Sequence, residues 1–270
     1  KPDDSGQIRL KGQYHHGQWM VRHYRKVVEM AAKYEIMIDA HEPIKATGIR
    51  RTYPNMMTRE GVRGMEYNAW SDGNPPSHTC ILPFTRGLAG PTDYTPGIFD
   101  VLFEAYKEKE RVQTTLAKQL ALMVVLYSPL QMAADLPENY RAHPEAFAFI
   151  EQLAVDWEES LVLDGEIGRY ITLVRKEREG QRWFLGSITN AEARNMAQPL
   201  SFLPAGKTFV AEIYADAPDA DWKTNPVAYN VSRHLADSSS TLDLKLAPGG
   251  GTAVIFRPAT EEETQELEKL

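Results

Sequence analysis

Residues 36–43 read Ile36-Met-Ile-Asp-Ala-His-Glu42-Pro43, a short apolar run that ends in a histidine and a carboxylate. The run follows residues 18–34, in which apolar side chains recur at helical spacing. A helix, a tight link and a buried strand are typical of α/β layering. In a barrel of strands and helices, catalytic side chains stand where the strands end. His41 and Glu42 occupy that position after a predicted strand at residues 36–38.

Two further glutamates follow closely, and we predict that the segment Gly64-Met-Glu66-Tyr67 is a second strand end. Carboxylates that are brought together repel each other, so at least one of Glu42, Glu60 and Glu66 should have a raised pKa and act as a general acid. A calcium ion would relieve the repulsion, because it takes several oxygen ligands. Hydrolysis of a glycoside also needs two carboxyl groups.

The same glutamates have a simpler interpretation. Four arginines lie near them in the sequence, and surface salt bridges are the commonest fate of such charges; these arginines are Arg50, Arg51, Arg59 and Arg63. Among the neighbouring aromatic residues, Tyr53, Tyr67 and Trp70 could stack on sugar rings or serve packing alone.

Three histidines, His15, His16 and His23, flank the first predicted helix. Their spacing matches no strong metal motif, so we expect surface or capping roles.

The second part of the chain has a different hydrophobic pattern. Five runs alternate with period 2 and are separated by turn residues, which predicts strands at residues 170–174, 183–188, 209–214, 242–246 and 252–256. We also predict helices at residues 112–132 and 144–153, and a short helix at 77–88. Strands that follow helices suggest two domains, the second a small all-β sandwich.

About 155 residues precede the sandwich, whereas a complete (β/α)8 barrel takes roughly 250 residues. The first part is therefore a different α/β arrangement or a barrel whose first strands lie outside this chain.

Composition excludes several classes of function. The net charge of −7, without any basic stripe, argues against a nucleic-acid partner. The longest apolar run, residues 120–126, is too short for a membrane span. Cys80 is the only cysteine, so neither an internal disulfide nor a cysteine-based metal site is expected.

Several motifs along almost the whole chain resemble glycoside hydrolase family 97, which includes α-glucosidases of starch utilisation and related α-galactosidases. They are Gly17-Gln-Trp-Met20, His41-Glu-Pro-Ile-Lys-Ala-Thr-Gly-Ile-Arg-Arg-Thr-Tyr-Pro-Asn55, Arg59-Glu60, Arg63-Gly-Met-Glu66-Tyr67, Phe84-Thr-Arg86, Gly90-Pro-Thr-Asp-Tyr-Thr-Pro-Gly-Ile-Phe99, Tyr127-Ser-Pro-Leu-Gln-Met-Ala-Ala-Asp135 and Tyr214-Ala-Asp-Ala217. The resemblance implies a partial (β/α)8 TIM-type barrel followed by a small all-β sandwich. We place the barrel portion at residues 1–158, the sandwich at 159–262 and an acidic tail at 263–270.

The resemblance also implies a role for each residue of the site. Glu66 would be the general acid, and Glu42 the general base that activates water. Glu42 and Glu60 would be ligands of a calcium ion (Ca2+) that lies close enough to Glu66 for direct contact. His41 and Glu42 would touch the sugar in the first subsite.

Glu42 further indicates the branch of the family. Retaining members resemble this chain but lack a carboxylate after the histidine, so the resemblance implies an inverting, exo-acting α-glucosidase of maltooligosaccharides. A retaining α-galactosidase and a catalytically incomplete carbohydrate-binding fragment are the alternatives. The family is largely periplasmic or associated with the cell envelope, which sets the expected location.

In the family fold, an N-terminal β-sandwich and the first barrel strands precede this region and supply a further calcium ligand and a second water-activating glutamate. We therefore expect the chain to hold part of the site. By itself it should be inactive or impaired, unless the N-terminal part of the same enzyme completes it.

Overall fold

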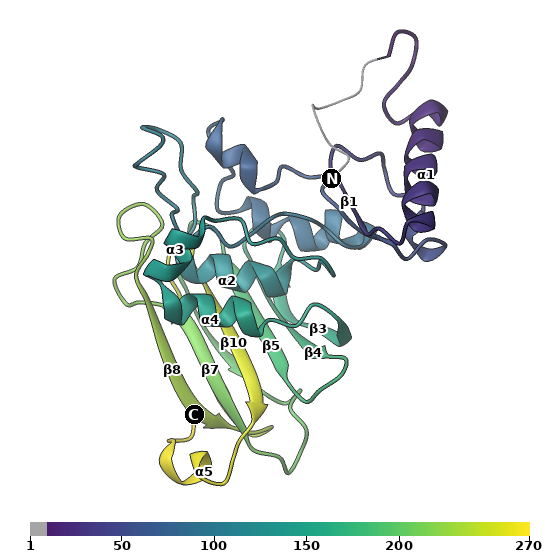
Figure 1. The fold of residues 1–270 in the computed structure, drawn as a ribbon. Helices are drawn as coiled ribbons and strands as arrows, with labels where there is room; N and C mark the ends of the chain where they lie inside the picture. The colour runs from purple at the N-terminus through teal and green to yellow at the C-terminus, as the bar shows by residue number, and fades with distance from the viewer. Residues whose placement is uncertain (1–9) are drawn as a thin grey trace.

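The structure is a computed structural model that describes residues 10–270 (Figure 1). Its α-helices are α1 (Gln18–Lys33), α2 (Leu116–Val125), α3 (Pro137–Ala142), α4 (Pro144–Gln152) and α5 (Glu263–Glu266). Its strands are β1 (Ile38–Ala40), β2 (Met56–Arg59), β3 (Trp157–Glu166), β4 (Tyr170–Glu177), β5 (Trp183–Thr189), β6 (Arg194–Pro199), β7 (Phe209–Asp216), β8 (Tyr229–Ala236), β9 (Thr241–Leu246) and β10 (Gly251–Pro258). Five 3-10 helices complete it: η1 (Ile49–Arg51), η2 (Met65–Ala69), η3 (His78–Cys80), η4 (Leu82–Phe84) and η5 (Arg86–Ala89). None of these helices is both long and apolar enough to cross a membrane.

The N-terminal layer consists of α1 and the parallel pair β1–β2, whose apolar side chains share one small core. Backbone hydrogen bonds continue this layer, since the Asp93 N–H donates to Arg59 and the Thr92 N–H donates to Tyr127. Successive segments therefore run side by side, as neighbouring strands of a barrel do.

The helix predicted at residues 18–34 is confirmed, but the strand that follows begins two residues later than predicted. Ile36 and Met37 are exposed, because a tight turn with Glu35 at positive φ still closes the helix. The Ile36 N–H donates to Ala31 within that turn, so the chain enters the layer only at Ile38.

Helix α2 is much shorter than the predicted residues 112–132. It begins after Thr115, whose hydroxyl oxygen accepts a hydrogen bond from the Lys118 N–H as an N-cap. It ends at Leu126, which is already extended, three residues before Pro129. The prediction failed because the apolar run continues into the segment that lies beside residue 92. The predicted helix at 77–88 is also wrong, since three short 3-10 helices replace it, with Pro83 inside η4.

The C-terminal region is an all-β sandwich, as predicted. Six antiparallel strands form one sheet in the order β3-β4-β5-β10-β7-β8, and β6 pairs with β9 in a second sheet. The five predicted strands are present, whereas β3, β6 and β8 were missed. Apolar side chains of the two sheets form one core between them.

The other face of the large sheet is covered by α2 and α4 (Figure 1). Every residue of α2 is buried there, and a second core joins both parts of the chain. The backbones approach closely at Gly186, where a Cβ would lie 2.8 Å from the Ala121 carbonyl oxygen. The acidic tail returns to the edge of the large sheet, since the Leu270 N–H donates to Leu235 in β8. The domain boundaries themselves stay a prediction.

Candidate active site

Polar side chains meet where three neighbouring segments end. His41 follows β1, Glu60 follows β2, and Asp93 lies on the extended segment hydrogen-bonded to Arg59. All three are buried, with exposed fractions of 3%, 6% and 2%. Charged groups of this kind are rarely buried unless they are paired or functional, so the cluster requires an explanation.

His41 is the centre of this cluster. Its Nε2 lies 2.6 Å from Asp93 Oδ2 and 3.6 Å from Asp39 Oδ2, while its Nδ1 lies 3.6 Å from Glu60 Oε2. Thr95 supports the arrangement, because its hydroxyl donates to the other Asp93 oxygen at 3.0 Å. Three carboxylates thus surround one imidazole ring.

The electrostatics follow from this packing. Burial by itself lowers the pKa of His41, but hydrogen bonds to Asp39 and Asp93 and the charge of Glu60 outweigh it and raise the pKa to about 10. Burial raises the pKa of Glu60 to about 7, with contributions from the charges of Glu66 and Glu42. The expected raised carboxyl pKa is therefore present, and it belongs to Glu60.

Asp39 and Asp93 differ from each other in spite of their proximity. Burial raises the pKa of Asp39. For Asp93, burial acts in the same direction, but the hydrogen bonds from His41 and Thr95 outweigh it, so its pKa is lowered. Asp93 is thus the ionised partner of the His41 imidazolium.

The predicted strand end at residues 64–67 is wrong, because Glu66 lies on the 3-10 helix η2. The turn is fixed from below: the Met65 N–H donates to the Tyr94 carbonyl at 2.9 Å. The Asn74 side chain donates to the Gly64 carbonyl at 3.0 Å. This turn, anchored by both hydrogen bonds, replaces the predicted strand. It places the exposed Glu66 carboxylate beside His41 and Glu60.

The three glutamates line one pocket of about 350 Å³. Donor atoms of His41, Glu60 and Glu66 all lie within 4.8 Å of one another. Glu42 lines the same pocket, but among the described residues it lies outside this close group. Its backbone has φ of +46°, which is uncommon for a residue other than glycine.

Gly64 is required for this geometry. A Cβ at Gly64 would lie 2.8 Å from Glu60 Oε1, so any larger residue would push the buried carboxylate out of place. The glycine therefore allows the η2 turn to pass directly over Glu60.

The salt-bridge interpretation of the glutamates is wrong. Within residues 10–270, no ion pair joins Arg50, Arg51, Arg59 or Arg63 to Glu42, Glu60 or Glu66. The Arg63 guanidinium lies over the Tyr67 ring instead, at 4.1 Å. Arg86 donates to the Arg59 and Glu60 carbonyls and holds the end of β2.

The aromatic and histidine predictions have mixed outcomes. Tyr67 and Trp70 line the pocket with ring centroids 4.1 Å apart, whereas Tyr53 lies outside it and donates to Glu29. His23 is exposed, as predicted. The expectation for His15 is wrong, because its side chain is buried and its Nε2 lies 3.1 Å from the Glu42 carbonyl oxygen.

Sequence reasoning missed Asp39 and Tyr24. Asp39 lies in β1, two residues before His41, which directly follows the strand. Residues two apart in extended backbone point to the same face, and that spacing could have identified it. Tyr24 carries no comparable signal, because its hydroxyl meets the site only through tertiary packing.

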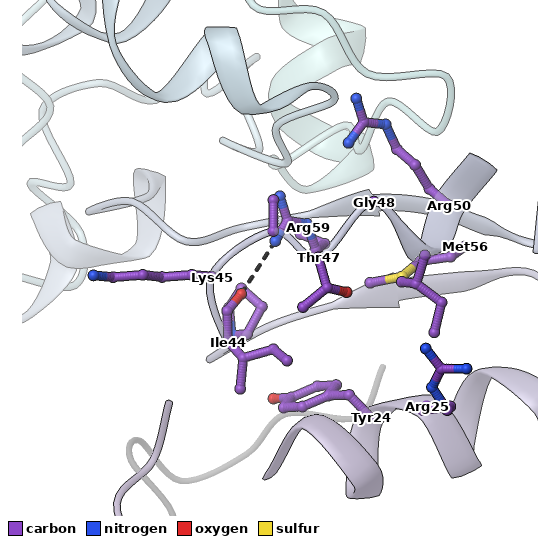
Figure 2. A pocket seen from close by; sticks show the side chains of 12 residues that line it. Tyr24, Arg25, Ile44, Lys45, Thr47, Gly48, Arg50, Met56 and Arg59 are labelled. Atoms are coloured by element: carbon purple, nitrogen blue, oxygen red, sulfur yellow. Dashed lines mark hydrogen bonds between the residues drawn. The ribbon is translucent and has the colours of Figure 1, made fainter. Parts of the chain in front are cut away.

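A second hollow lies under the loop that follows Glu42 (Figure 2). Its lining includes Arg25, Lys45, Arg50 and Arg59, and none of the lining residues within 10–270 carries a carboxylate. Its volume of about 20 Å³ accommodates little more than one water molecule. Neither a sugar nor an acid–base pair fits there, so the glutamate pocket is the candidate active site.

Two family models match the chain: "Glycoside hydrolase 97" at residues 5–62, which includes His41, Glu42 and Glu60, and "Glycosyl-hydrolase 97 C-terminal, oligomerisation" at residues 156–257. The chain belongs to glycoside hydrolase family 97. Its relatives support this assignment over most of its length. A retaining alpha-galactosidase of Bacteroides thetaiotaomicron is 37% identical over 85% of the chain and 35% of that protein.

Solved structures agree with the family assignment. A glycoside hydrolase family 97 enzyme from Pseudoalteromonas sp. strain K8, in complex with panose, is 52% identical and superposes with a TM-score of 0.89. The match covers 92% of our chain and 38% of that one, and the same relative has also been solved with acarbose. The fold class, a partial barrel followed by an all-β sandwich, is confirmed.

The chain spans about a third of the length of the relatives that it matches.

Proposed function

We propose that the protein is an exo-acting, inverting α-glucosidase of maltooligosaccharides. The observation that carries the proposal is the convergence of Glu42, Glu60 and Glu66 on one pocket, beside a buried histidine. Membership of a family of glycoside hydrolases supplies the reaction class, and two carboxyl groups are what that reaction needs.

In this proposal Glu66 is the general acid that protonates the leaving oxygen, since its carboxyl group is exposed to the pocket. Glu42 is the general base. An inverting base must leave room for a water molecule between itself and the sugar. The position of Glu42 in the pocket, outside the close group of Glu60 and Glu66, supports that role.

His41 binds the sugar in the first subsite. The ring is 3% exposed and lies outside the pocket lining, where Asp39, Glu60 and Asp93 hold it. Its Nε2 faces Asp39 and Asp93, so the sugar hydroxyl would be met from the Nδ1 side, beside Glu60. Tyr67 and Trp70 offer aromatic faces at the same pocket, against which an apolar face of a sugar ring can pack.

The donor set also fits calcium. Carboxylate oxygens are its preferred ligands. Burial is the main cause of the raised pKa of Glu60, and the charges of Glu66 and Glu42 add to it, so a nearby cation would stabilise the ionised carboxylate. Glu60 and Glu66 would hold the ion, and Glu42 would complete the set from its place in the same pocket. Bound calcium would neutralise these carboxylates and polarise the sugar oxygens nearby.

A retaining α-galactosidase is the second candidate, because curated relatives at 37% and 33% identity carry the names retaining alpha-galactosidase and probable retaining alpha-galactosidase. Two observations favour the glucosidase. A solved relative at 52% identity, which is more similar to the chain than these curated relatives, is in complex with panose, an oligosaccharide of glucose. Glu42 also provides a base that a retaining mechanism does not require.

The decisive assay compares two substrates with the full-length protein. We expect glucose release from maltose to exceed galactose release from melibiose by at least about 100-fold in kcat/KM, which corresponds to roughly 3 kcal/mol. A preference for melibiose would overturn the glucosidase proposal. Binding of maltose in calorimetry without turnover of either sugar would instead indicate a carbohydrate-binding module. The periplasmic or cell-envelope location stays a prediction.

A further inference from the structure

Glu42 has an unusual backbone conformation. Its φ of +46° lies in the left-handed region, which costs a side-chain-bearing residue free energy. Pro43 follows it, and a residue before proline is normally restricted to extended conformations. Strain of this kind persists only where the surroundings impose it, and it is concentrated at functional sites.

Two buried side chains make hydrogen bonds to this residue's carbonyl oxygen. The Tyr24 hydroxyl donates to the Glu42 carbonyl at 2.7 Å and reaches the His41 carbonyl at 3.1 Å. His15 Nε2 lies 3.1 Å from the same Glu42 oxygen and, because a carbonyl only accepts, that nitrogen carries the proton. Tyr24 and His15 are each 6% exposed, so water competes little for these contacts.

The two donors come from separate elements. Tyr24 projects from α1 toward the loop that follows Glu42, as Figure 2 shows, and His15 precedes that helix. Neither residue belongs to the close group of carboxylates and His41. Their common target is one carbonyl oxygen, and turning that peptide would redirect the side chain of Glu42.

We propose that Tyr24 and His15 are positioning residues that hold the Glu42 carbonyl in its left-handed conformation and thereby fix the direction of the Glu42 carboxylate. This inference rests on the proposed role of Glu42 as the general base. The positioning depends on hydrogen bonds to the backbone and not on charge; Tyr24 lies outside the pocket lining, whereas His15 belongs to it.

The main test is Tyr24→Phe in the full-length protein, which removes one hydroxyl and keeps the ring in the small core of α1, β1 and β2. We expect kcat on maltose to fall about 10- to 100-fold, because small displacements of a catalytic group have effects of that size. KM should change less than about two-fold. An activated α-glucoside should show the same fall, since the acid Glu66 is untouched.

Tyr53→Phe is the matched control. Tyr53 packs in the same layer, and its hydroxyl donates to Glu29 at 3.1 Å, away from the pocket. Its removal should leave kcat within about two-fold of the wild type. Equal losses in both variants would mean that the layer, and not the Glu42 carbonyl, is responsible, which would overturn the inference.

A double-mutant cycle separates positioning from general support. If Tyr24 acts through Glu42, then Tyr24→Phe combined with Glu42→Gln should be no slower than Glu42→Gln alone. If the two losses multiply, Tyr24 acts independently and the inference is wrong.

The same cycle distinguishes the two proposals. An impaired Glu42→Gln with a fully active Tyr24→Phe overturns the positioning role alone. A fully active Glu42→Gln overturns the proposed function and the inference together.

His15 offers an independent check. Glutamine places an amide N–H near the position of Nε2, so His15→Gln should keep most of the activity. His15→Leu lacks the donor and should lose about as much as Tyr24→Phe. Similar rates in both His15 variants would contradict a role for the hydrogen bond.

Discussion

The barrel portion and the sandwich differ in how their ionisable side chains are buried and partnered. Around His41 the chain buries three carboxylates, Asp39, Glu60 and Asp93, each with an oxygen within 3.6 Å of a ring nitrogen. In the sandwich, the Arg169–Glu166 ion pair has side chains that are 48% and 54% exposed. Asp216, which is buried there, instead meets the backbone N–H groups of Ala247 and Gly251. The sandwich satisfies its buried carboxylates with backbone hydrogen bonds and arginine partners, whereas the barrel portion gathers several carboxylates around one histidine, as active sites do.

The contrast is tested most severely by Glu66→Gln. We expect kcat on maltose to fall about 100- to 10,000-fold, the usual contribution of a general acid. A substrate with an activated leaving group should lose less, because its departure needs little protonation.

The same exchange in the sandwich, Glu192→Gln, is the control, because Glu192 is 64% exposed and paired only with arginines in that region. It should leave kcat unchanged. Nearly normal hydrolysis of maltose by Glu66→Gln would show that Glu66 is not the general acid. The buried cluster of the barrel portion would then have no catalytic explanation.

Removal of calcium should have the next largest effect. Chelation should abolish most of the activity and lower Tm, since an ion at 100 times its Kd stabilises the folded state by about 2.7 kcal/mol. Added calcium should restore both. Glu60→Gln should weaken this response. An unchanged rate and an unchanged Tm after chelation would contradict the calcium site.

Titration of Asp216 should make the stability of the fold depend on pH without changing the active site. Burial raises its pKa to about 6, against the hydrogen bonds from Thr115, Ala247 and Gly251. The unfolded chain loses this proton near pH 4, so the folded state holds the extra proton between about pH 4 and pH 6. The free energy of unfolding therefore decreases as the pH rises through this window, by about 3 kcal/mol in total.

Asp216→Asn should lack this decrease. Urea unfolding at several pH values would measure it, and kcat would serve as the control because Asp216 lies outside the glutamate pocket. Parallel pH curves for the variant and the wild type would show that Asp216 is ionised in the folded state throughout.

The smallest effect is expected for Arg169→Ala. Exposed ion pairs contribute about 0–1 kcal/mol, so both the free energy of unfolding and kcat should stay close to the wild-type values. A loss well above 1 kcal/mol in urea unfolding would show that the exposed charges of the sandwich matter more than the contrast allows.

The regular elements were predictable where the sequence repeats strongly. Helix α1 and five sandwich strands were found because their apolar spacing is clear. Strand β3 was missed since most of its residues are exposed at the edge of the sheet, and exposed residues carry no alternation. Helix α2 was overestimated because all of its residues are buried, so the pattern has no polar face to mark its end.

The site was predictable only in part. Motifs identified His41, Glu42, Glu60 and Glu66, but not their geometry, and the 3-10 helix that carries Glu66 was mistaken for a strand end. Long-range contacts such as Tyr24 with the Glu42 carbonyl leave no local pattern, so they became visible only in the structure.

We propose that Glu42 activates water on the side of the sugar opposite to Glu66. Proton NMR during the first minutes of maltose hydrolysis by the full-length protein tests it most directly, because the anomer released first records the stereochemistry. We expect β-glucose from the α-linked substrate, followed by slow mutarotation. Release of α-glucose as the first product would contradict the inverting mechanism and the assignment of Glu42 as its base.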